Sequence, residues 1–270
     1  MNIAFIGGGN MAQALIGGLL AKAHAREAIR VVDPAAAARD RLASQFGVEC
    51  HAACSANAVE ADVVVLVVKP QQMREAAAAL RPYLARQLVL SIAAGVRLAD
   101  LSRWLGGHRQ LVRGMPNTPA LIGQGIAGLY APPGVSDGGK RYAEQILGAV
   151  GETLWIGDEA MMDAITAVSG SGPAYVFYFI EALQHGAERL GFSTGDAHKL
   201  ALATFRGAAL LASAGTDPVS VLRGRVTSKG GTTEAALASM DQSGVRDAIV
   251  AAVAAANRRG QELGEQLGKD

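Results

Sequence analysis

Short apolar runs alternate with amphipathic segments through the first half of the chain. The runs are rich in Val, Ile and Leu, as in strands, and the segments between them carry apolar residues at helical spacing. Val63–Val68 contains no polar residue, which is expected of a central strand covered on both sides. This alternation predicts a parallel sheet with helices on both faces. The predicted strands are 2–6, 29–32, 48–50, 63–68, 88–92 and 111–115, and the predicted helices are 13–23, 35–46, 71–80 and 98–105.

The pattern changes after Trp155-Ile156-Gly157-Asp158. No strand-like run follows, and the rest of the chain is typical of helices punctuated by Gly, Ser and Pro. We predict helices over 173–190 and 196–214, a third that opens at Asp217-Pro218, and a fourth from Glu234. The chain is therefore predicted to have an α/β domain over residues 1–157 and an all-α domain over residues 158–270.

Ala174–Ile180, within the first of these helices, is apolar on every side. A helix without a polar face must be buried all round, and a helical domain of this size offers limited interior. An intersubunit core is the favoured location, so the all-α domain is predicted to mediate dimerisation. A central helix in a monomeric bundle is the alternative.

A glycine-rich turn follows the first predicted strand, in the order Gly7-Gly8-Gly9-Asn10-Met11-Ala12. It fits G-x-G-x-x-A, in which Gly7 makes the tight bend, Gly9 lets a pyrophosphate approach the backbone, and Ala12 allows close helix packing. Phosphate would bind the free N–H groups at the helix start. Asp33 ends the second strand, about where such folds place the carboxylate that binds the ribose. The α/β domain is thus predicted to be a Rossmann dinucleotide-binding domain.

Three further segments follow strands and should reach the same edge of the sheet: Val68–Pro70, Ser91–Gly95 and Met115–Pro119. Small side chains at Ala93 and Ala94 would leave room for a nicotinamide ring. Lys69 would reach ribose or phosphate, although a solvated lysine at a strand end is an equally good interpretation. The predicted cofactor-binding residues are Ile6, Gly7, Gly8, Gly9, Asn10, Met11, Asp33, Val68, Lys69, Pro70, Ala93, Ala94 and Asn117.

A second candidate anion site is Val226–Thr233, which leads into the last predicted helix listed above. Two glycines and two threonines lie where backbone N–H groups are unpaired, an arrangement suited to a carboxylate or phosphate. Ordinary capping by Thr232 or Thr233 is the alternative. Two successive glycines weaken a helix, however, and capping alone does not explain them.

The net charge of +1 gives no electrostatic footprint for nucleic acid or an anionic membrane. The apolar runs are shorter than a membrane span needs, and the first residues do not resemble an export leader. Cys50, His51 and Cys54 lie close together, but a structural zinc site needs four ligands and no second Cys/His pair is suitably spaced. Reduced thiols, no metal and a cytoplasmic location are the expectation.

None of the five histidines lies in a candidate site segment. Dehydrogenases that act on alcohols need a positioned proton acceptor, commonly His or Lys. An imine can already be protonated in solution, so its reduction needs only hydride, orientation and a hydrogen bond. An imine reductase therefore fits these residues.

The chain resembles the pyrroline-5-carboxylate reductases almost end to end. The segments that carry the resemblance are Phe5–Met11, Val68–Pro70, Ser91–Gly95, Met115–Ala120, Ser169–Tyr175 and Val226–Ala235. The resemblance implies reduction of 1-pyrroline-5-carboxylate to L-proline, the last step of proline biosynthesis, by NADPH or NADH. It also implies a nicotinamide domain followed by a helical domain that interlocks with its partner, giving a homodimer that in some members assembles into larger rings.

The same resemblance assigns roles to residues of Val226–Thr233, the Gly/Thr segment. The substrate carboxylate would bind the N–H groups around Gly230, Gly231 and Thr232, with help from Ser228. The Thr233 hydroxyl would be hydrogen-bonded to the ring nitrogen, which makes Thr233 the catalytic residue.

Departures from the family pattern are few. Lys229 stands where many relatives have Pro and could attract the substrate carboxylate; Cys54 aligns with an Asn, so Ser55 could replace a ribose contact. Family members often prefer NADPH, whereas Asp33 should repel a 2′-phosphate, and Arg39 and Arg41 are interpreted as surface charges. We predict that both cofactors work.

Two alternative functions remain. A 3-hydroxyisobutyrate-type dehydrogenase shares the glycine-rich start and the helical second domain, but the lysine of that pattern is missing after Gly170-Ser171-Gly172. A regulatory protein that senses NAD(P) without catalysis would have little reason to keep Gly230–Thr233.

Overall fold

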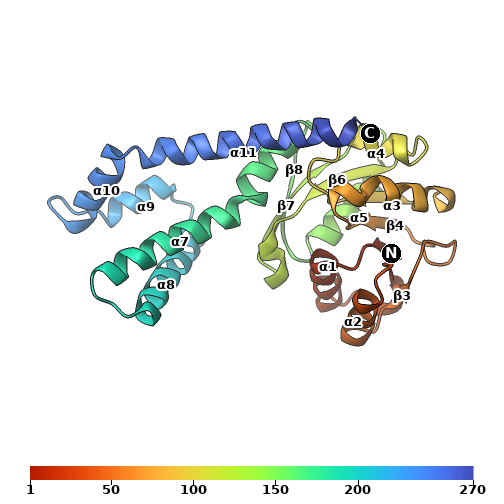
Figure 1. Ribbon diagram of the computed structural model, residues 1–270, viewed down its shortest axis with the longest axis horizontal. Helices are drawn as coiled ribbons and strands as arrows, with labels where there is room; N and C mark the ends of the chain where they lie inside the picture. The colour runs from red at the N-terminus through yellow and green to blue at the C-terminus, as the bar shows by residue number, and fades with distance from the viewer. Residues whose placement is uncertain (270) are drawn as a thin grey trace. The chain divides into compact units, whose positions relative to one another are not determined.

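The computed structural model describes residues 1–269, and an eight-stranded sheet organises the first part of the chain (Figure 1). The strand order is β3-β2-β1-β4-β5-β6-β7-β8. Neighbours from β3 to β6 are parallel, which confirms the predicted parallel sheet over that range. The strands are β1 Ile3–Ile6, β2 Ile29–Val32, β3 Glu49–His51, β4 Val63–Leu66, β5 Leu88–Ser91, β6 Leu111–Met115, β7 Gly125–Tyr130 and β8 Gly151–Trp155.

The pairing of β7 with β6 is antiparallel, so the sheet departs from the predicted parallel arrangement at this end, beyond the last predicted strand. Only the short connection Pro116–Gln124 joins the two strands. A parallel pair needs a crossover of about a dozen residues or more, usually through a helix. The connection is too short for that, so the chain turns back.

Helices cover both faces of the sheet. They are α1 Asn10–Ala21, α2 Ala36–Phe46, α3 Met73–Leu80, α4 Leu98–Trp104, α5 Asp137–Leu147 and α6 Met161–Ile165. The predicted helix 13–23 begins earlier, at Asn10, because the glycine turn leads directly into it, and it ends before Ala23, which has a positive φ of 61°. The predicted helix 71–80 starts at Met73, after a 3-10 turn that begins at Pro70.

Strands β7 and β8 and helix α5 lie where the pattern predicts no element. Gly151 comes so close to β7 that an added Cβ would lie 1.9 Å from the carbonyl oxygen of Gly125, and a Cβ on Gly128 would lie 2.7 Å from Ile165. Glycines replace the branched residues that mark a strand in sequence, because another backbone or side chain fills the space. Helix α5 likewise has two glycines directly after its first residue, Asp137, and its N-cap is Ser136, whose hydroxyl accepts a hydrogen bond from the N–H of Gly139.

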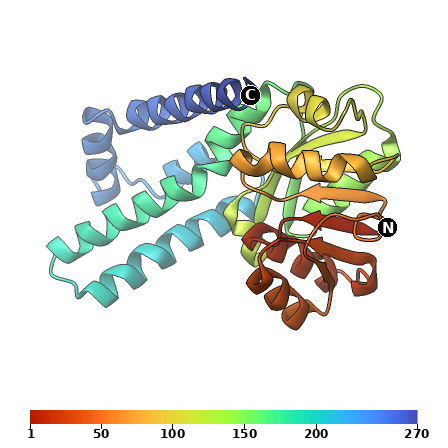
Figure 2. The ribbon, with the colours of Figure 1, turned by 45° about the vertical axis from the view of Figure 1, so that its right-hand side comes forward.

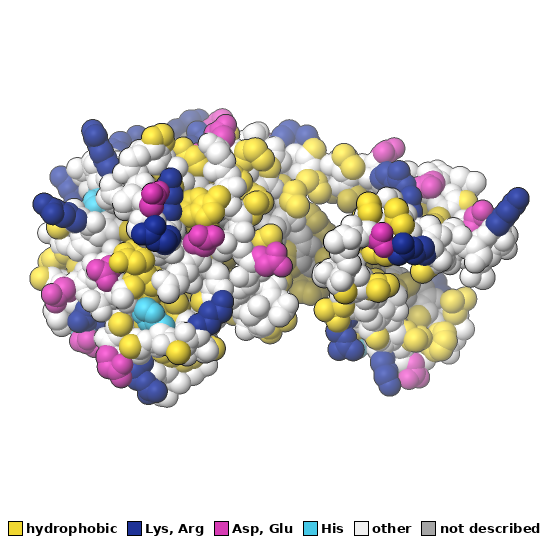
Figure 3. Space-filling model, turned by 180° about the vertical axis from the view of Figure 1, so that it is seen from behind, with side chains coloured by type: hydrophobic (Ala, Val, Ile, Leu, Met, Phe, Trp, Pro, Cys, Tyr) yellow, Lys and Arg dark blue, Asp and Glu magenta, His cyan; other side chains and the backbone are white. Residues whose placement is uncertain are grey.

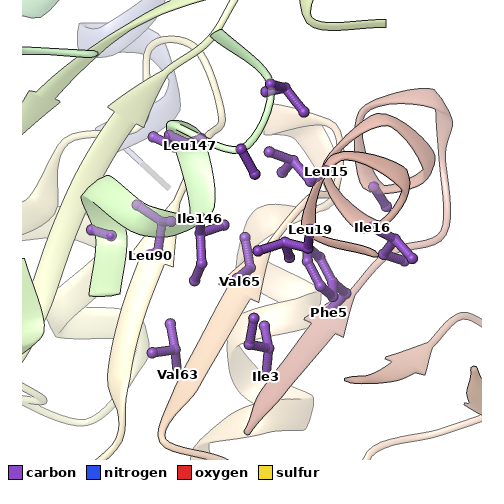
Figure 4. Close-up of a cluster of buried hydrophobic side chains, with 14 of the residues drawn as sticks. Ile3, Phe5, Leu15, Ile16, Leu19, Val63, Val65, Leu90, Ile146 and Leu147 are labelled. Carbon is purple, nitrogen blue, oxygen red and sulfur yellow. The ribbon is translucent and has the colours of Figure 1, made fainter. Parts of the chain in front are cut away.

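Two buried clusters lie on opposite faces of the sheet. Figure 4 shows the first, in which Leu15 and Leu19 of α1 and Ile146 of α5 meet Phe5 and Val65 of the central strands. The second joins alternate strand residues such as Val64 with Met73 of α3 and Leu101 of α4. Both clusters hold the central strands in place, and with them the loops at the carboxyl edge.

The chain divides into two compact units. The first is Met1–Ser171 together with the chain from Ala256 onward, and the second is Gly172–Ala255. The predicted boundary at residue 157 coincides with the end of the last strand, β8, but the compact division comes later. Helix α6 stays with the first unit because Ile165 packs on Gly128 of β7.

The second unit contains helices only, as predicted. They are α7 Gly172–Arg189, α8 Thr194–Ser213, α9 Val219–Arg225, α10 Thr232–Gln242 and the first part of α11 Val245–Gly268. Helices α7 and α8 lie side by side in both ribbon views (Figure 2). The helix predicted from Glu234 begins two residues earlier, so Thr232 and Thr233 are its first helical residues and Gly231 is the N-cap.

The apolar segment of α7 is open to solvent in the single chain. Val176, Phe177 and Tyr178 are 44%, 61% and 70% exposed. Many other hydrophobic side chains of this unit are also exposed, and several are visible in yellow on its surface in Figure 3. An isolated chain rarely leaves so much apolar surface uncovered. In residues 1–269, no helix is both long and apolar enough to cross a lipid bilayer.

Candidate dinucleotide and substrate sites

The glycine-rich turn has the geometry of a phosphate-binding loop. Gly7 has a φ of +105°, and an added Cβ would lie 2.6 Å from the carbonyl oxygen of Val67. A Cβ on Gly8 would lie 3.0 Å from Leu42, whereas a Cβ on Gly9 would meet nothing within 4 Å. Gly7 and Gly8 thus make room for the protein itself, while Gly9 leaves open space in front of α1. The first N–H groups of α1 have no acceptor within the helix, and its N-cap Gly9 has no side chain to supply one.

Asp33 is tied to this turn. Its carboxylate accepts hydrogen bonds from the N–H of Gly8 at 2.7 Å and from the N–H of Ala35 at 2.8 Å. A carboxylate oxygen can accept more than one hydrogen bond, so these two bonds do not use up the acceptor capacity of Asp33. Asp33 therefore orders the glycine turn in addition to standing where a ribose is expected.

Arg39 and Arg41 donate hydrogen bonds beside Asp33 and the glycine turn. Arg41 is exposed, as its interpretation as a surface charge expects, whereas Arg39 is half-buried. Arg39 donates to the carbonyl oxygens of Asp33 and Pro34, both at 2.8 Å, and Arg41 donates to the carbonyl oxygen of Gly8 at 2.9 Å. Their spacing along α2 gives no sequence signal for this, because residues two positions apart on a helix do not face the same side. The two guanidinium groups and the Asp33 carboxylate thus all contact the backbone of the glycine turn or of the residues directly after β2.

The other predicted cofactor segments follow neighbouring strands. The N–H of Val67 donates to the carbonyl oxygen of Ile6 at 2.8 Å, and the N–H of Ile92 donates to that of Leu66 at 3.3 Å. Val68–Pro70 and Ala93–Ala94 therefore leave the sheet beside the glycine turn, at the carboxyl edge where open α/β sheets bind ligands. Lys69 is exposed and Ala93 is buried. Met11 and Asn10 begin α1 at the same edge.

The side chain of Asn117 serves the protein itself. Its amide nitrogen donates to the carbonyl oxygen of Ser169 at 3.1 Å, and its amide oxygen accepts from the N–H of Ile126 at 3.0 Å. The residue is buried, and it ties the loop after β6 to β7 and to the turn after α6. A contact of Asn117 with a cofactor would therefore come from its backbone.

The Gly/Thr segment, Val226–Thr233, leads into α10, and some of its backbone N–H groups already donate hydrogen bonds within the protein. Gly230 has a φ of +73°, and its N–H donates to the Glu234 carboxylate at 2.6 Å. The N–H of Gly231 donates to the carbonyl oxygen of Ser228 at 3.0 Å. The first N–H groups of α10, on Thr232 and Thr233, have no acceptor within the helix.

In this structure the N–H groups of Gly230 and Gly231, which the resemblance assigns to the substrate carboxylate, have acceptors within the protein. Gly230 and Gly231 give the turn before α10 its conformation. The backbone N–H groups without an acceptor within the helix belong to Thr232 and Thr233. The role of Glu234 is missed by sequence reasoning, although its position three residues after the N-cap is a known capping spacing. Capping by a threonine side chain, the alternative interpretation, does not occur because Gly231 is the N-cap.

Both cysteines are free and half-buried. Burial raises the pKa of the Cys50 and Cys54 thiols. The hydroxyl of Ser55, the suggested replacement for a ribose contact, accepts a hydrogen bond from the N–H of Ala58 at 3.2 Å. Residues 1–269 contain no cluster of three or more side chains suited to a metal ion.

The raised thiol pKa values predict slow alkylation. At pH 8 both thiols hold less thiolate than an unperturbed cysteine, and the thiolate is the reactive form. Native protein should therefore react with iodoacetamide more slowly than urea-unfolded protein, as followed by mass spectrometry. Equal rates in the two states would contradict this prediction.

Comparison with known proteins identifies the family. The catalogued protein "Pyrroline-5-carboxylate reductase" of Pseudomonas aeruginosa is 48% identical over 268 residues, which cover 99% of this chain and 98% of that protein. The chain belongs to the pyrroline-5-carboxylate reductase family. The reductase of the same name from Haemophilus influenzae is 42% identical over 97% of both chains. Residues 159–263 match the family model for pyrroline-5-carboxylate reductase dimerisation, and residues 2–95 match one described as NADP oxidoreductase, coenzyme F420-dependent.

Solved structures of reductases agree. A pyrroline-5-carboxylate reductase from Coxiella burnetii superposes with a TM-score of 0.92 at 40% identity, over 97% of this chain and 98% of that one. The Plasmodium falciparum pyrroline carboxylate reductase, solved with NADP bound, gives a TM-score of 0.85 at 28% identity over 98% of both chains. A 3-hydroxyisobutyrate dehydrogenase of Mycobacterium tuberculosis shares only the fold, with a TM-score of 0.52 at 20% identity over 71% of this chain and 66% of that one.

Proposed function

We propose that this member of the family reduces 1-pyrroline-5-carboxylate to L-proline with NADPH or NADH, as the last step of proline biosynthesis. The observation that carries the proposal is a pair of helix starts of different design. One follows Gly9, with open space for a pyrophosphate, and the other begins at Thr232, with free N–H groups for a carboxylate. Both belong to a chain whose full length matches reductases of this name.

A nicotinamide bound at the first unit would supply the hydride. The N–H groups of Thr232 and Thr233 hold the substrate carboxylate, with Ser228 and Lys229 beside them, and the Thr233 hydroxyl is hydrogen-bonded to the ring nitrogen. At the cofactor, Gly9, Asn10 and Met11 contact the pyrophosphate, with Ile6, Gly7 and Gly8 shaping the turn. Val68, Lys69, Pro70, Ala93, Ala94 and the backbone of Asn117 border the nicotinamide half. Binding and orientation supply most of the rate enhancement.

A direct assay tests the reaction. Loss of reduced-nicotinamide absorbance is followed with 1-pyrroline-5-carboxylate and with NADPH or NADH at equal concentration. Formation of proline in step with cofactor oxidation is expected. Tight cofactor binding without turnover would overturn the proposal and favour a protein that senses NAD(P).

Asp33, Arg39 and Arg41 are proposed to set the preference between NADPH and NADH. The carboxylate disfavours a 2′-phosphate, while Arg39 and Arg41 attract it. Two unit charges about 4 Å apart interact by about 1 to 4 kcal/mol, depending on solvent exposure. We therefore expect Asp33→Asn to raise the NADPH-to-NADH ratio of kcat/KM about tenfold, because each 1.4 kcal/mol is a factor of ten.

Steady-state kinetics with both cofactors measure that ratio. Asp40→Asn, on the exposed surface of α2, removes the same charge nearby and is the matched control. An unchanged ratio in Asp33→Asn would mean that Asp33 only orders the glycine turn.

The exposed face of α7 is proposed to be buried in a homodimer, and larger rings of dimers are the further assembly that the family resemblance suggests. Phe177 is 61% exposed in the single chain. Burying such a side chain contributes about 1.5–3 kcal/mol, and a buried, unpaired carboxylate costs more. We expect Phe177→Asp to dissociate the protein into monomers in sedimentation velocity.

Tyr83→Asp is the matched control, since it places the same charge on an exposed aromatic position of the first unit. If Phe177→Asp sediments like the unmodified protein, α7 is not at the interface. A cytoplasmic location is proposed with this assembly, because Cys50 and Cys54 are both free thiols.

A further inference from the structure

The loop between β5 and α4 depends on residues far away in sequence. It spans 92–97 and includes Ala93 and Ala94, which the proposed function places against the nicotinamide. Helix α4 has only seven residues, and its N-cap Arg97 offers no side-chain acceptor. A helix this short is not stable on its own, so its start and the loop before it must be held by tertiary contacts.

Glu159 supplies one of these contacts. Its Oε1 accepts a hydrogen bond from the N–H of Leu98, the first residue of α4, at 2.8 Å. The carboxylate thus satisfies a donor of the helix start from 61 residues away. It also places a negative charge at the amino end of α4, where the helix dipole favours it.

Arg113 of β6 holds Glu159 in that position. Arg113 is only 3% exposed, and its Nη1 donates to the same Oε1 of Glu159 at 3.1 Å, while its Nη2 lies 3.8 Å from the Asp163 carboxylate. Strand β6 is hydrogen-bonded to β5, so Arg113 fixes Glu159, and with it the start of α4, relative to the sheet.

The end of α11 closes the loop from another direction. A Cβ on Gly264 would lie 3.2 Å from the carbonyl oxygen of Gly95 and 3.2 Å from Nε of Arg97, and a Cβ on Gly95 would lie 3.2 Å from Leu267. The guanidinium of Arg103 in α4 donates to the carbonyl oxygen of Gly268 at 2.9 Å, beside the C-terminus marked in Figure 1. The helix backbone therefore lies directly against the loop, and position 264 has no space for a side chain unless Arg97 or the loop moves.

We propose that Glu159 and Gly264 are positioning residues for the nicotinamide half of the cofactor. They act through the loop: Glu159 fixes where α4 begins, and Gly264 fixes how far the loop can move away from the sheet. This inference rests on the proposed contact between Ala93–Ala94 and the nicotinamide. Neither residue takes part in hydride or proton transfer.

The proposal separates the two halves of the cofactor. A misplaced nicotinamide should slow hydride transfer, and displacements of about 1 Å can cost roughly 100-fold in rate. We expect Glu159→Ala and Gly264→Ala each to lower kcat about 10- to 100-fold and to weaken NADPH binding. The affinity for 2′-phospho-ADP-ribose, which lacks the nicotinamide, should not change, because the glycine turn and Asp33 are untouched.

Three variants serve as comparisons. Glu159→Gln keeps an oxygen for the N–H of Leu98 and should recover most of the kcat. Gly138→Ala is the control for Gly264→Ala, since it also replaces a helical glycine in the first unit but its Cβ would meet nothing closer than 3.8 Å. Ala94→Leu fills the nicotinamide side of the loop directly and tests the underlying assignment.

The outcomes are distinct. Equal loss of NADPH and 2′-phospho-ADP-ribose affinity in Glu159→Ala and Gly264→Ala would indicate general destabilisation and overturn the positioning role. Wild-type kinetics in these two variants, with impaired NADPH binding in Ala94→Leu, would overturn it while leaving the cofactor assignment intact. Wild-type kinetics and NADPH binding in Glu159→Ala, Gly264→Ala and Ala94→Leu alike, with turnover of 1-pyrroline-5-carboxylate retained, would show that the loop does not border the nicotinamide.

Discussion

Replacing Thr233 by valine is expected to lower kcat for 1-pyrroline-5-carboxylate about 100-fold, the scale on which single positioned hydrogen-bonding groups act in catalysis. Valine has nearly the shape of threonine and keeps the backbone N–H, so the carboxylate contact survives. The change removes only the hydroxyl proposed for the ring nitrogen. The loss should therefore appear in kcat more than in KM.

Steady-state kinetics with varied substrate and saturating NADPH measure this split, and Thr233→Ser is the matched variant because it restores a hydroxyl at the same place. We expect the serine variant to regain most of the rate. NADPH affinity should be the same in both variants, since Thr233 is not among the residues proposed to contact the cofactor. If valine and serine lose activity equally, the methyl group or the helix start matters and the hydroxyl does not.

Local pattern predicted the residues at the carboxyl edge because each is attached to a strand with a clear signal. Val63–Leu66 is fully buried, and its sequence contains only apolar branched residues. The glycine turn was equally readable, since the positive φ of Gly7 and the open space at Gly9 are requirements that glycine meets directly. Such signals extend over a few residues and need no knowledge of the rest of the chain.

The features that sequence did not predict depend on contacts between distant segments. Glu159 meets Leu98 only because β6 and the turn before α6 bring them together, and no spacing along the chain encodes that hydrogen bond. Strand β7 is hidden for a related reason, because Gly125 and Gly128 are set by what packs against them. Sequence also could not show which backbone N–H groups already have an acceptor in the folded chain. It names Gly230 as a candidate donor, but the N–H of Gly230 donates to the Glu234 carboxylate.

Alanine substitutions at Gly7 and Gly9 of the glycine turn should have different effects, one on protein stability and the other on NADPH binding. Gly9→Ala is expected to weaken NADPH binding about 100-fold while the free energy of unfolding without cofactor stays the same. Its Cβ meets no protein atom within 4 Å, so the cost arises only when a pyrophosphate approaches. Loss of one or two charge-assisted hydrogen bonds, about 1.5–3 kcal/mol each, accounts for a change of that size.

Gly7→Ala should instead destabilise the protein before any cofactor binds. The φ of +105° is unfavourable for alanine, and the new Cβ would lie 2.6 Å from the carbonyl oxygen of Val67. Backbone strain of this kind costs about 1–3 kcal/mol, and displacement of Val67 adds to it. Thermal unfolding with and without NADPH distinguishes the two variants, because a ligand that binds only the folded state raises Tm, and at a given ligand concentration the rise is larger when the ligand binds more tightly.

Gly9→Ala should then unfold at the Tm of the unmodified protein and gain little from NADPH. Gly7→Ala should start from a lower Tm, and its folded fraction should still respond to the cofactor, because the space in front of α1 remains open. The opposite pattern, a destabilised Gly9→Ala beside a stable Gly7→Ala without cofactor binding, would reverse the roles assigned to the two glycines. The phosphate would then have to bind against the Val67 side of the turn, where the structure places the neighbouring backbone.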